Sequence, residues 1–344
     1  MDVAVIHGNE FNVAKIISDL AGWFRVGLRT FDSDSTDPSF EAAAHLFCSS
    51  LVTNEQFRRV RTAVETCVGE KFFVFPTHNK KNISRLQDLN GQDYFTLPVN
   101  GSELRDVIKH AVNGRTEGLW TDLDPITQAA LKQSLACFED CFSRIQRGEP
   151  LPIDDIYASS RQIRDAACGD TFDTWIDALA NHHNYSFRHS MFACGALTYF
   201  AHSIGIGAND LERLTVGGLM HDIGKSMIPV EILDKPGELD DAEWQIMRKH
   251  PIYARDILMR ETDLGPDIIT MAAHHHEKLD GTGYPYGLSG TQIDDRTRLI
   301  AIADVYSALI DERCYKPAIT NEQALDLMAS FEGHLDMDLF KAFR

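Results

Sequence analysis

Strand patterns in this sequence are confined to its first third, and this constrains the fold more than any other feature. Up to about residue 115, short apolar runs alternate with amphipathic stretches; the runs are VAVIH, FRVGLRT, AHLFCSS, KFFVFPT and DYFTLPV. Strands separated by helices favour a parallel α/β sheet, because a parallel connection needs about a dozen residues. Residues 102–112 carry apolar side chains at helical spacing and predict a closing helix.

Beyond Pro152, helical periodicity replaces the strand patterns and recurs through residue 343. A further helix is predicted over 124–147, with Pro125 in its first turn and Gly148-Glu149-Pro150 as its stop. We therefore expect an α/β domain and an all-α domain joined by a connector helix. The expected boundaries are 1–115 for the α/β domain, 116–150 for the connector and 151–344 for the all-α domain.

An apolar stripe at helical spacing runs along the predicted connector helix. It consists of Leu131, Leu135, Phe138, Phe142 and Ile145. Such a stripe must be covered, because exposed apolar surface is costly. Two ways of covering it stay open at this point, namely a homodimer interface or packing inside the monomer.

Charge and cysteine usage exclude several classes of protein. The chain has 344 residues and a net charge of −18, of which only −2 belongs to the first 120 residues. This balance argues against a nucleic-acid partner, because negative surfaces repel phosphate backbones. The seven cysteines are irregularly spaced, which favours reduced thiols over a disulfide framework. Without a long apolar run or a basic leader, we expect a cytoplasmic protein with no membrane partner.

The first 115 residues resemble a response-regulator receiver domain of the flavodoxin-like class, with DYFTLPVNGSEL near the end. A working receiver needs acids after its first and third strands and a lysine before the last proline. Here the first strand runs into His7-Gly8-Asn9, the third ends at Phe47-Cys48-Ser49, and Leu97 precedes Pro98. Magnesium and a phosphoryl group need carboxylates. We therefore predict a pseudo-receiver that is not phosphorylated on aspartate; the alternative is an unrelated α/β interaction domain.

Histidines are concentrated in the helical part of the chain, where nine of the fourteen fall between residues 182 and 276. His221-Asp222 follows an apolar helical run, and neighbouring helix residues diverge by roughly 100°, so the pair can flank a cation. His189, His250, His275-His276 and Asp304 also interrupt apolar helical stretches. A single histidine of this kind is usually a satisfied core residue. Several of them in one helical domain predict a metal site, because buried polar groups are costly when unpaired.

Three segments carry a specific family resemblance. They are HDIGKSMIPVEILDKPGELDDAEWQIMRKHP (221–251), HHEKLDGTGYP (275–285) and RLIAIADVYSALIDERCYKPAI (298–319). With Gly283-Tyr284-Pro285 after the histidine pair, this region resembles the HD-GYP subgroup of the HD phosphohydrolase superfamily. The resemblance implies a metal-dependent phosphodiesterase, a hydrolase of bacterial signal transduction. Its expected reaction is hydrolysis of cyclic di-GMP to linear pGpG, with GMP as a further product left open, by a metal-bridged hydroxide.

The resemblance also implies a binuclear metal centre. One ion would be held by His189, His221, Asp222 and Asp304, and the second by Asp222, His250, His275 and His276. Imidazoles and carboxylates without thiolates suit divalent transition metals. We expect iron or manganese, with nickel or zinc as alternatives. Tyr185 stands where some family members carry a glutamate for a third metal, so two metals are predicted; His182 and His183 are interpreted as exposed residues at a helix end.

Other roles follow from the same resemblance. Asp222 and Lys225 are the predicted catalytic residues, with Lys225 neutralising charge on the phosphoryl oxygens. Arg313 and Lys316 would contact the other phosphate. Tyr284, or Tyr286 beside it, would stack on a guanine, and the glycine-rich loop over 277–288 could also dock protein partners. Ser307 replaces a usual aspartate, which predicts slow but real activity.

Three functional hypotheses therefore remain. The first is hydrolysis of cyclic di-GMP. The second keeps the metal chemistry but changes the substrate to pGpG or cyclic GMP-AMP. The third is a non-catalytic nucleotide-binding or protein-docking module, in which the pseudo-receiver and the glycine-rich loop bind partners.

Overall fold

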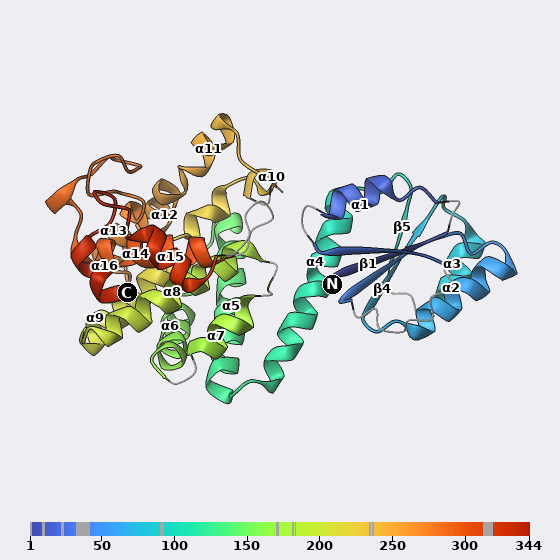
Figure 1. Cartoon of the computed structure of the whole chain (residues 1–344), viewed down its shortest axis with the longest axis horizontal. Coiled ribbons are helices and arrows are strands. Elements are labelled where there is room, and N and C mark those ends of the chain that lie inside the picture. The colour runs from blue at the N-terminus through green and yellow to red at the C-terminus, as the bar shows by residue number, and fades with distance from the viewer. Residues whose placement is uncertain are drawn as a thin grey trace. The chain divides into compact units, whose positions relative to one another are not determined.

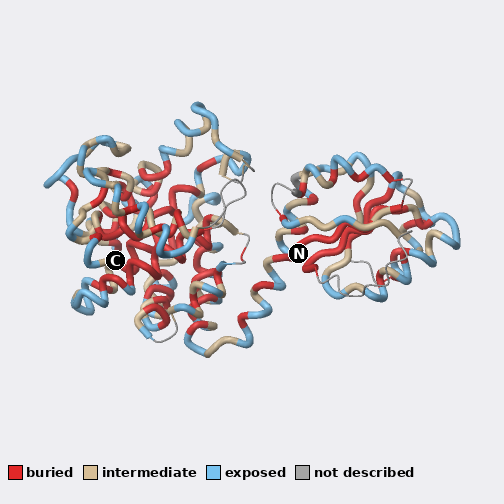
Figure 2. Tube along the Cα trace, viewed as in Figure 1, coloured by how far each residue is buried: buried red, intermediate tan, exposed pale blue. Residues whose placement is uncertain are grey.

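The structure is a computed structural model that describes residues 2–8, 11–21, 24–31, 42–89, 93–169, 172–180, 182, 184–233, 235, 237–311 and 319–344. It consists of two compact units, Met1–Gly118 and Leu119–Arg344 (Figure 1). In Figure 2, buried segments are concentrated along the strands of the first unit and in the helices inside the second.

The first unit contains a five-stranded parallel sheet in the order β2-β1-β3-β4-β5. The strands are β1 (Val3–His7), β2 (Val26–Thr30), β3 (Ala44–Cys48), β4 (Glu70–Phe75) and β5 (Asp93–Thr96). Val3 pairs with Val26 on one side and with Ala44 on the other. The predicted parallel α/β sheet is confirmed, and its strand order is that of flavodoxin-like folds.

Helices cover both faces of this sheet. They are α1 (Ala14–Ala21), α2 (Asn54–Thr66), α3 (Lys80–Gln87) and α4 (Gly101–Leu119). Apolar residues of α1 and α4 pack with Val3 and Val5, whereas those of α2 and α3 pack with Ile6 and Phe47 on the other face. The closing helix predicted over 102–112 is present but continues to Leu119.

The second unit is helical. Its longer helices are α5 (Pro125–Arg147), α6 (Ile153–Ala167), α7 (Phe172–Ala180), α8 (Tyr185–Ser203), α9 (Ala208–Met220), α12 (His250–Leu258), α13 (Pro266–His274), α14 (Asp295–Ile310) and α15 (Asn321–Met328). Shorter elements are η1 (Trp120–Asp122), η2 (Ile223–Met227), α10 (Val230–Leu233), α11 (Asp241–Met247), η3 (Gly290–Gln292) and α16 (Met337–Phe343). In the described part of this unit, β pairing is limited to a bridge between Asp280 and Ser289.

Helix α5 begins and ends where the sequence predicts. The Asp124 carboxylate accepts hydrogen bonds from the first free amides, and Gly148 closes the helix with a φ of 70°. Its apolar stripe lies against the core of the helical unit, with Leu131 and Phe138 buried and Phe142 partly buried. Packing inside the monomer therefore covers the stripe, so a dimer is not needed to explain its apolar residues.

Helices α8 and α9 form the centre of the helical unit and carry the first residues of the site. A side chain at Gly218 would put its Cβ 3.1 Å from Cys194 Cα, so glycine allows the two helices to approach closely. This approach brings the end of α9, where His221 and Asp222 lie, next to the start of α8. Within the described residues, no helix is long and apolar enough to span a bilayer.

Candidate metal centre

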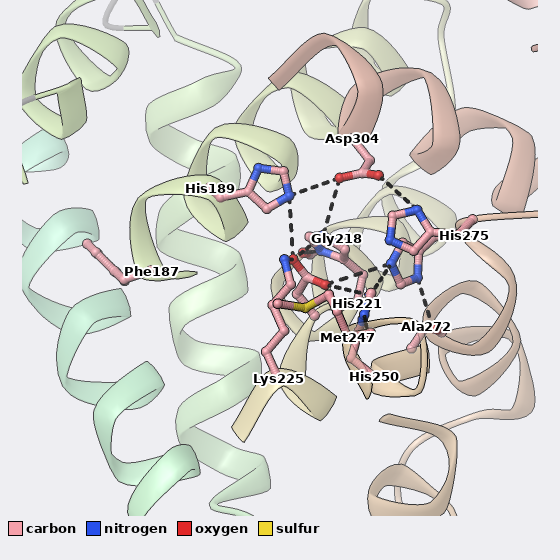
Figure 3. A network of polar contacts seen from close by, with 12 residues as sticks. Phe187, His189, Gly218, His221, Lys225, Met247, His250, Ala272, His275 and Asp304 are labelled. Carbon is pink, nitrogen blue, oxygen red and sulfur yellow. Dashed lines mark hydrogen bonds and ion pairs between the residues drawn. The ribbon is translucent and has the colours of Figure 1, made fainter. Parts of the chain in front are cut away.

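Seven side chains singled out by the sequence meet at one buried place in the helical unit (Figure 3). They are His189 on α8, His221 and Asp222 at the end of α9, His250 at the start of α12, His275 and His276 after α13, and Asp304 on α14. They form three overlapping groups whose ligand atoms lie within 4.8 Å of one another in each group. Six of them are buried, and the seventh, His276, is 25% exposed.

Three of the histidines are oriented by their own backbone. Each places Nδ1 on the carbonyl oxygen three residues earlier: His221 on Gly218 (2.7 Å), His250 on Met247 (2.8 Å) and His275 on Ala272 (2.9 Å). Figure 3 shows these contacts. When each Nδ1 carries the proton and donates to its carbonyl, each Nε2 presents a lone pair to the cluster, where the Nε2 atoms of His250 and His275 lie 3.2 Å apart.

Asp222 lies between two sets of imidazoles and presents a different oxygen to each. Its Oδ2 is 3.4 Å from Nε2 of His189 and 3.4 Å from Nε2 of His221. Its Oδ1 is 3.2 Å from Nε2 of His250 and 3.8 Å from Nε2 of His275. This arrangement allows one carboxylate to bridge two cations.

Asp304 supplies the second carboxylate from α14, where the apolar residues Ile302 and Ala303 before it are buried. Its Oδ1 lies 2.9 Å from His189 Nε2, and its Oδ2 lies 3.5 Å from His276 Nδ1. Lys225, on η2, is also buried and contacts Asp222 Oδ2. The centre therefore combines two carboxylates, five imidazoles and one ammonium group.

The protonation of most of these groups suits metal binding; His221 is the exception, because burial lowers its pKa but its neighbours, chiefly Asp222, raise it by more. Burial opposes ionisation of both aspartates, but the Lys225 charge holds the pKa of Asp222 well below its usual value. A hydrogen bond with His189 likewise holds the pKa of Asp304 well below its usual value. Burial and the neighbouring imidazoles hold the pKa of His275 well below its usual value. Charged carboxylates and neutral imidazoles are the forms that ligate cations.

Two buried atoms at the centre indicate what the site holds. His221 Nε2 and Asp222 Oδ1 have no hydrogen-bond partner among the described residues. A buried polar atom without a partner is costly and calls for a specific explanation, such as an ion. Imidazole nitrogens and carboxylate oxygens are the donors that divalent transition metals prefer. The residues present therefore fit divalent metal ions.

The glycine-rich loop over 277–288 is held against this centre. Glu277, which is buried, accepts hydrogen bonds from the amides of Tyr286 (2.6 Å) and Leu288 (2.9 Å). A Cβ at Gly283 would lie 2.4 Å from Lys278 N, so only glycine fits. Sequence analysis missed Glu277, although an acid placed directly between the histidine pair and a glycine-rich segment was a usable signal.

Both loop tyrosines contact other side chains. The ring of Tyr284 stacks on His276 with centroids 4.7 Å apart and an interplanar angle of 30°. Burial disfavours the charged form of both side chains. It therefore raises the pKa of the Tyr284 hydroxyl and lowers the pKa of the His276 imidazole to about 3. Tyr286 is exposed and contacts Arg255 through its hydroxyl.

Other predicted positions differ from expectation or fall outside the described residues. His182 is not exposed at a helix end: it is 1% exposed, because its ring stacks on Trp120 at 5.7 Å. His183, Arg313 and Lys316 lie outside the described residues. Ser307 is fully buried one turn beyond Asp304, and its hydroxyl has no partner among the described residues.

Comparisons with known proteins show what the helical unit is similar to. Residues 173–339 match the family model described as HD domain. The cyclic di-GMP phosphodiesterase PA4108 of Pseudomonas aeruginosa is 36% identical over 159 residues, which cover 46% of this chain and 38% of that protein. The 3'3'-cGAMP-specific phosphodiesterase 3 of Vibrio cholerae is 36% identical over 197 residues, covering 56% of this chain and 40% of that protein. The chain thus spans about two fifths of the length of these curated relatives.

A solved structure shares the fold. Bd1817, an HDG"Y"P protein from Bdellovibrio bacteriovorus, superposes with a TM-score of 0.51 and 17% identity, covering 70% of this chain and 79% of that one. Residues 173–339 of the helical unit therefore resemble the HD-domain family, and the unit carries the tripeptide Gly283-Tyr284-Pro285 shortly after the paired histidines.

Proposed function

We propose that this protein is a metal-dependent phosphodiesterase that hydrolyses cyclic di-GMP to linear pGpG. The observation that carries the proposal is the position of Asp222, which presents one carboxylate oxygen to each of two histidine sets inside a buried centre. Relatives named cyclic di-GMP phosphodiesterase, at 36% and 41% identity, support the substrate class.

The seven side chains would hold two divalent ions. His189, His221 and Asp304 would hold the first with Asp222 Oδ2, and His250, His275 and His276 the second with Asp222 Oδ1. Iron or manganese is favoured over nickel or zinc. When bound, such a pair supplies Lewis acidity towards phosphate and activates water near neutral pH.

The remaining residues act on the substrate. Lys225 places its ammonium group beside Asp222 in a buried setting, where a positive charge stabilises developing phosphoryl charge more strongly than it would in water. Of the two loop tyrosines predicted to stack on a guanine base, Tyr284 already stacks on His276 and lies under Arg248, whereas Tyr286 is exposed. Arg313 and Lys316 stay as predicted contacts of the second phosphate.

A second substrate has specific support. Relatives from Vibrio cholerae named 3'3'-cGAMP-specific phosphodiesterases are 36% to 42% identical to this chain. Because these values overlap those of the cyclic di-GMP enzymes, cyclic GMP-AMP is the alternative substrate. Hydrolysis of pGpG would be a later step at the same centre.

The first unit is proposed to be a pseudo-receiver that binds protein partners. At the ends of β1 and β3, the described residues are His7-Gly8 and Cys48-Ser49, without a carboxylate. Aspartyl phosphorylation would need acids there.

Anaerobic purification with Fe²⁺ or Mn²⁺, metal analysis and product identification test the proposal. Wild type should carry two metals per chain and open cyclic di-GMP faster than cyclic GMP-AMP, whereas Asp222→Ala should lose both metals and turnover. A chelator should abolish turnover, and Mn²⁺ should restore it. Metal-loaded wild type that binds cyclic di-GMP but leaves it intact would favour the docking-module hypothesis.

A further inference from the structure

Two of the five imidazoles lack the support that orients the other three. His221, His250 and His275 each use Nδ1 on a backbone carbonyl. In the described part of the chain, His189 Nδ1 has no hydrogen-bond partner, and His276 directs its Nδ1 towards Asp304 instead. Bonds of this kind normally help to fix ligating histidines, so these two rings lack one of the contacts that orient the other three.

A tyrosine ring stacks on each of these two histidines. Tyr185 lies one turn before His189 on α8, with ring centroids 5.8 Å apart and an interplanar angle of 11°. Tyr284 stacks on His276 at 4.7 Å and 30°. Both separations fall in the range of offset-stacked aromatic pairs, about 4.5 to 7 Å.

An arginine lies over each of these tyrosines. The guanidinium carbon of Arg188 is 5.9 Å from the Tyr185 ring centroid, and that of Arg248 is 5.3 Å from the Tyr284 centroid. Both distances fall within the roughly 6 Å reach of a cation–π contact. The same arrangement of arginine, tyrosine and histidine thus occurs twice, on elements far apart in sequence.

Arg188 is itself held firmly. Its Nε donates to Asp311 Oδ1 at 2.6 Å, and a terminal nitrogen donates to the His182 carbonyl at 2.8 Å. The side chains of this ion pair are 10% and 2% exposed. A buried ion pair contributes little net stability. What it does here is hold the guanidinium of Arg188 close to Tyr185.

We propose that Tyr185 and Tyr284 are positioning residues that orient His189 and His276, each held in turn by an arginine, in place of the missing backbone hydrogen bond. The inference rests on the proposed metal-dependent function, because it assumes that both histidines ligate cations. It also gives a role to Tyr185, which stands where the resemblance places a glutamate ligand.

Titration of the full chain with Mn²⁺, followed by equilibrium dialysis and electron paramagnetic resonance, tests the inference. Tyr185→Leu should weaken one of two Mn²⁺ sites by about 10- to 100-fold, as loss of a supporting contact does elsewhere, and replace the coupled-pair signal with that of isolated Mn²⁺. Tyr185→Phe keeps the ring and should bind within about threefold of wild type. Tyr284→Leu and Tyr284→Phe should behave in the same way at the other site.

Two further variants serve as a control for the helix and as a test of the arginine. Tyr199→Leu removes an exposed tyrosine from the same helix and should leave both sites unchanged. The double variant Arg188→Gln with Asp311→Asn removes the cation without stranding a buried charge, and should weaken one site by about two- to fivefold.

The outcomes separate this inference from the proposed function. Wild-type Mn²⁺ affinity in Tyr185→Leu, or equal losses in the Leu and Phe variants, would overturn the inference and leave the function standing. Wild type that binds two Mn²⁺ but cleaves no cyclic dinucleotide would overturn the function alone. Wild type that binds no Mn²⁺ would overturn both.

Discussion

The two units of this chain bury polar side chains in different ways. In the first unit, Asn82 is buried and its Oδ1 accepts the Leu51 amide at 2.9 Å, so the side chain satisfies the backbone. In the helical unit, Asp222 and Asp304 face imidazoles, and Asp222 Oδ1 has no hydrogen bond among the described residues. A buried polar group that satisfies an amide maintains the fold, whereas one that faces other ligands costs free energy until a cation binds.

Glu277 shows that the role of a buried polar side chain depends on its hydrogen-bond partners and not on the unit in which it lies. It follows His276 of the candidate metal centre directly, yet its two oxygens each accept a hydrogen bond from a backbone amide. We therefore class it with Asn82 as a residue of the fold, and Asp304 with Asp222 as a residue of the centre.

The largest expected effect separates two aspartates of the same helix. Asp304→Asn should lower metal affinity and cyclic dinucleotide hydrolysis by more than about 100-fold, because it removes a charged ligand and not merely its support. Asp295 lies on the same helix with a 90% exposed side chain, so Asp295→Asn is the matched control. Metal analysis and turnover of the two variants measure the difference, and equal behaviour would remove Asp304 from the centre.

A smaller effect is expected for Glu277→Gln. The amide side chain can accept only one of the two backbone hydrogen bonds, so the free energy of unfolding should fall by about 3 kcal/mol. Denaturant unfolding measures this loss. Trypsin should also cut faster after Lys278, since the loop that follows is no longer held. Unchanged stability and unchanged cleavage would show that the loop does not depend on this carboxylate.

Asn82→Ala tests the same principle in the first unit. The buried Leu51 amide would lose its acceptor, at a cost of about 2 kcal/mol. Calorimetry of the full chain should show this loss while the metal content stays at the wild-type value. A change in metal content would contradict the assignment of Asn82 to the fold alone.

How far the sequence predicts this molecule depends on the range of the contacts. Local patterns predict the strands and helix α5. The two ends of α5 are set by Asp124 and Gly148, which directly flank the helix in the sequence. The seven residues of the centre are candidates because they interrupt apolar helical stretches, and the family resemblance then divides them between two metal ions. The pair of Arg188 with Asp311 joins positions 123 residues apart, and nothing local indicates it. His182 was predicted to be exposed because its partner Trp120 lies far away in the sequence.

Ser307 provides the smallest and sharpest test, because its buried hydroxyl meets neither a backbone group nor a ligand among the described residues. Ser307→Ala should therefore leave turnover within about twofold and change the free energy of unfolding by no more than about 1 kcal/mol, in the stabilising direction. Ser134 is the control, since its buried hydroxyl donates to the Ala130 carbonyl and Ser134→Ala should cost about 1 kcal/mol. Denaturant unfolding and turnover measure both. A tenfold loss of turnover in Ser307→Ala would place this hydroxyl in the centre, and would show that a position where the family resemblance implies an aspartate still serves the reaction here.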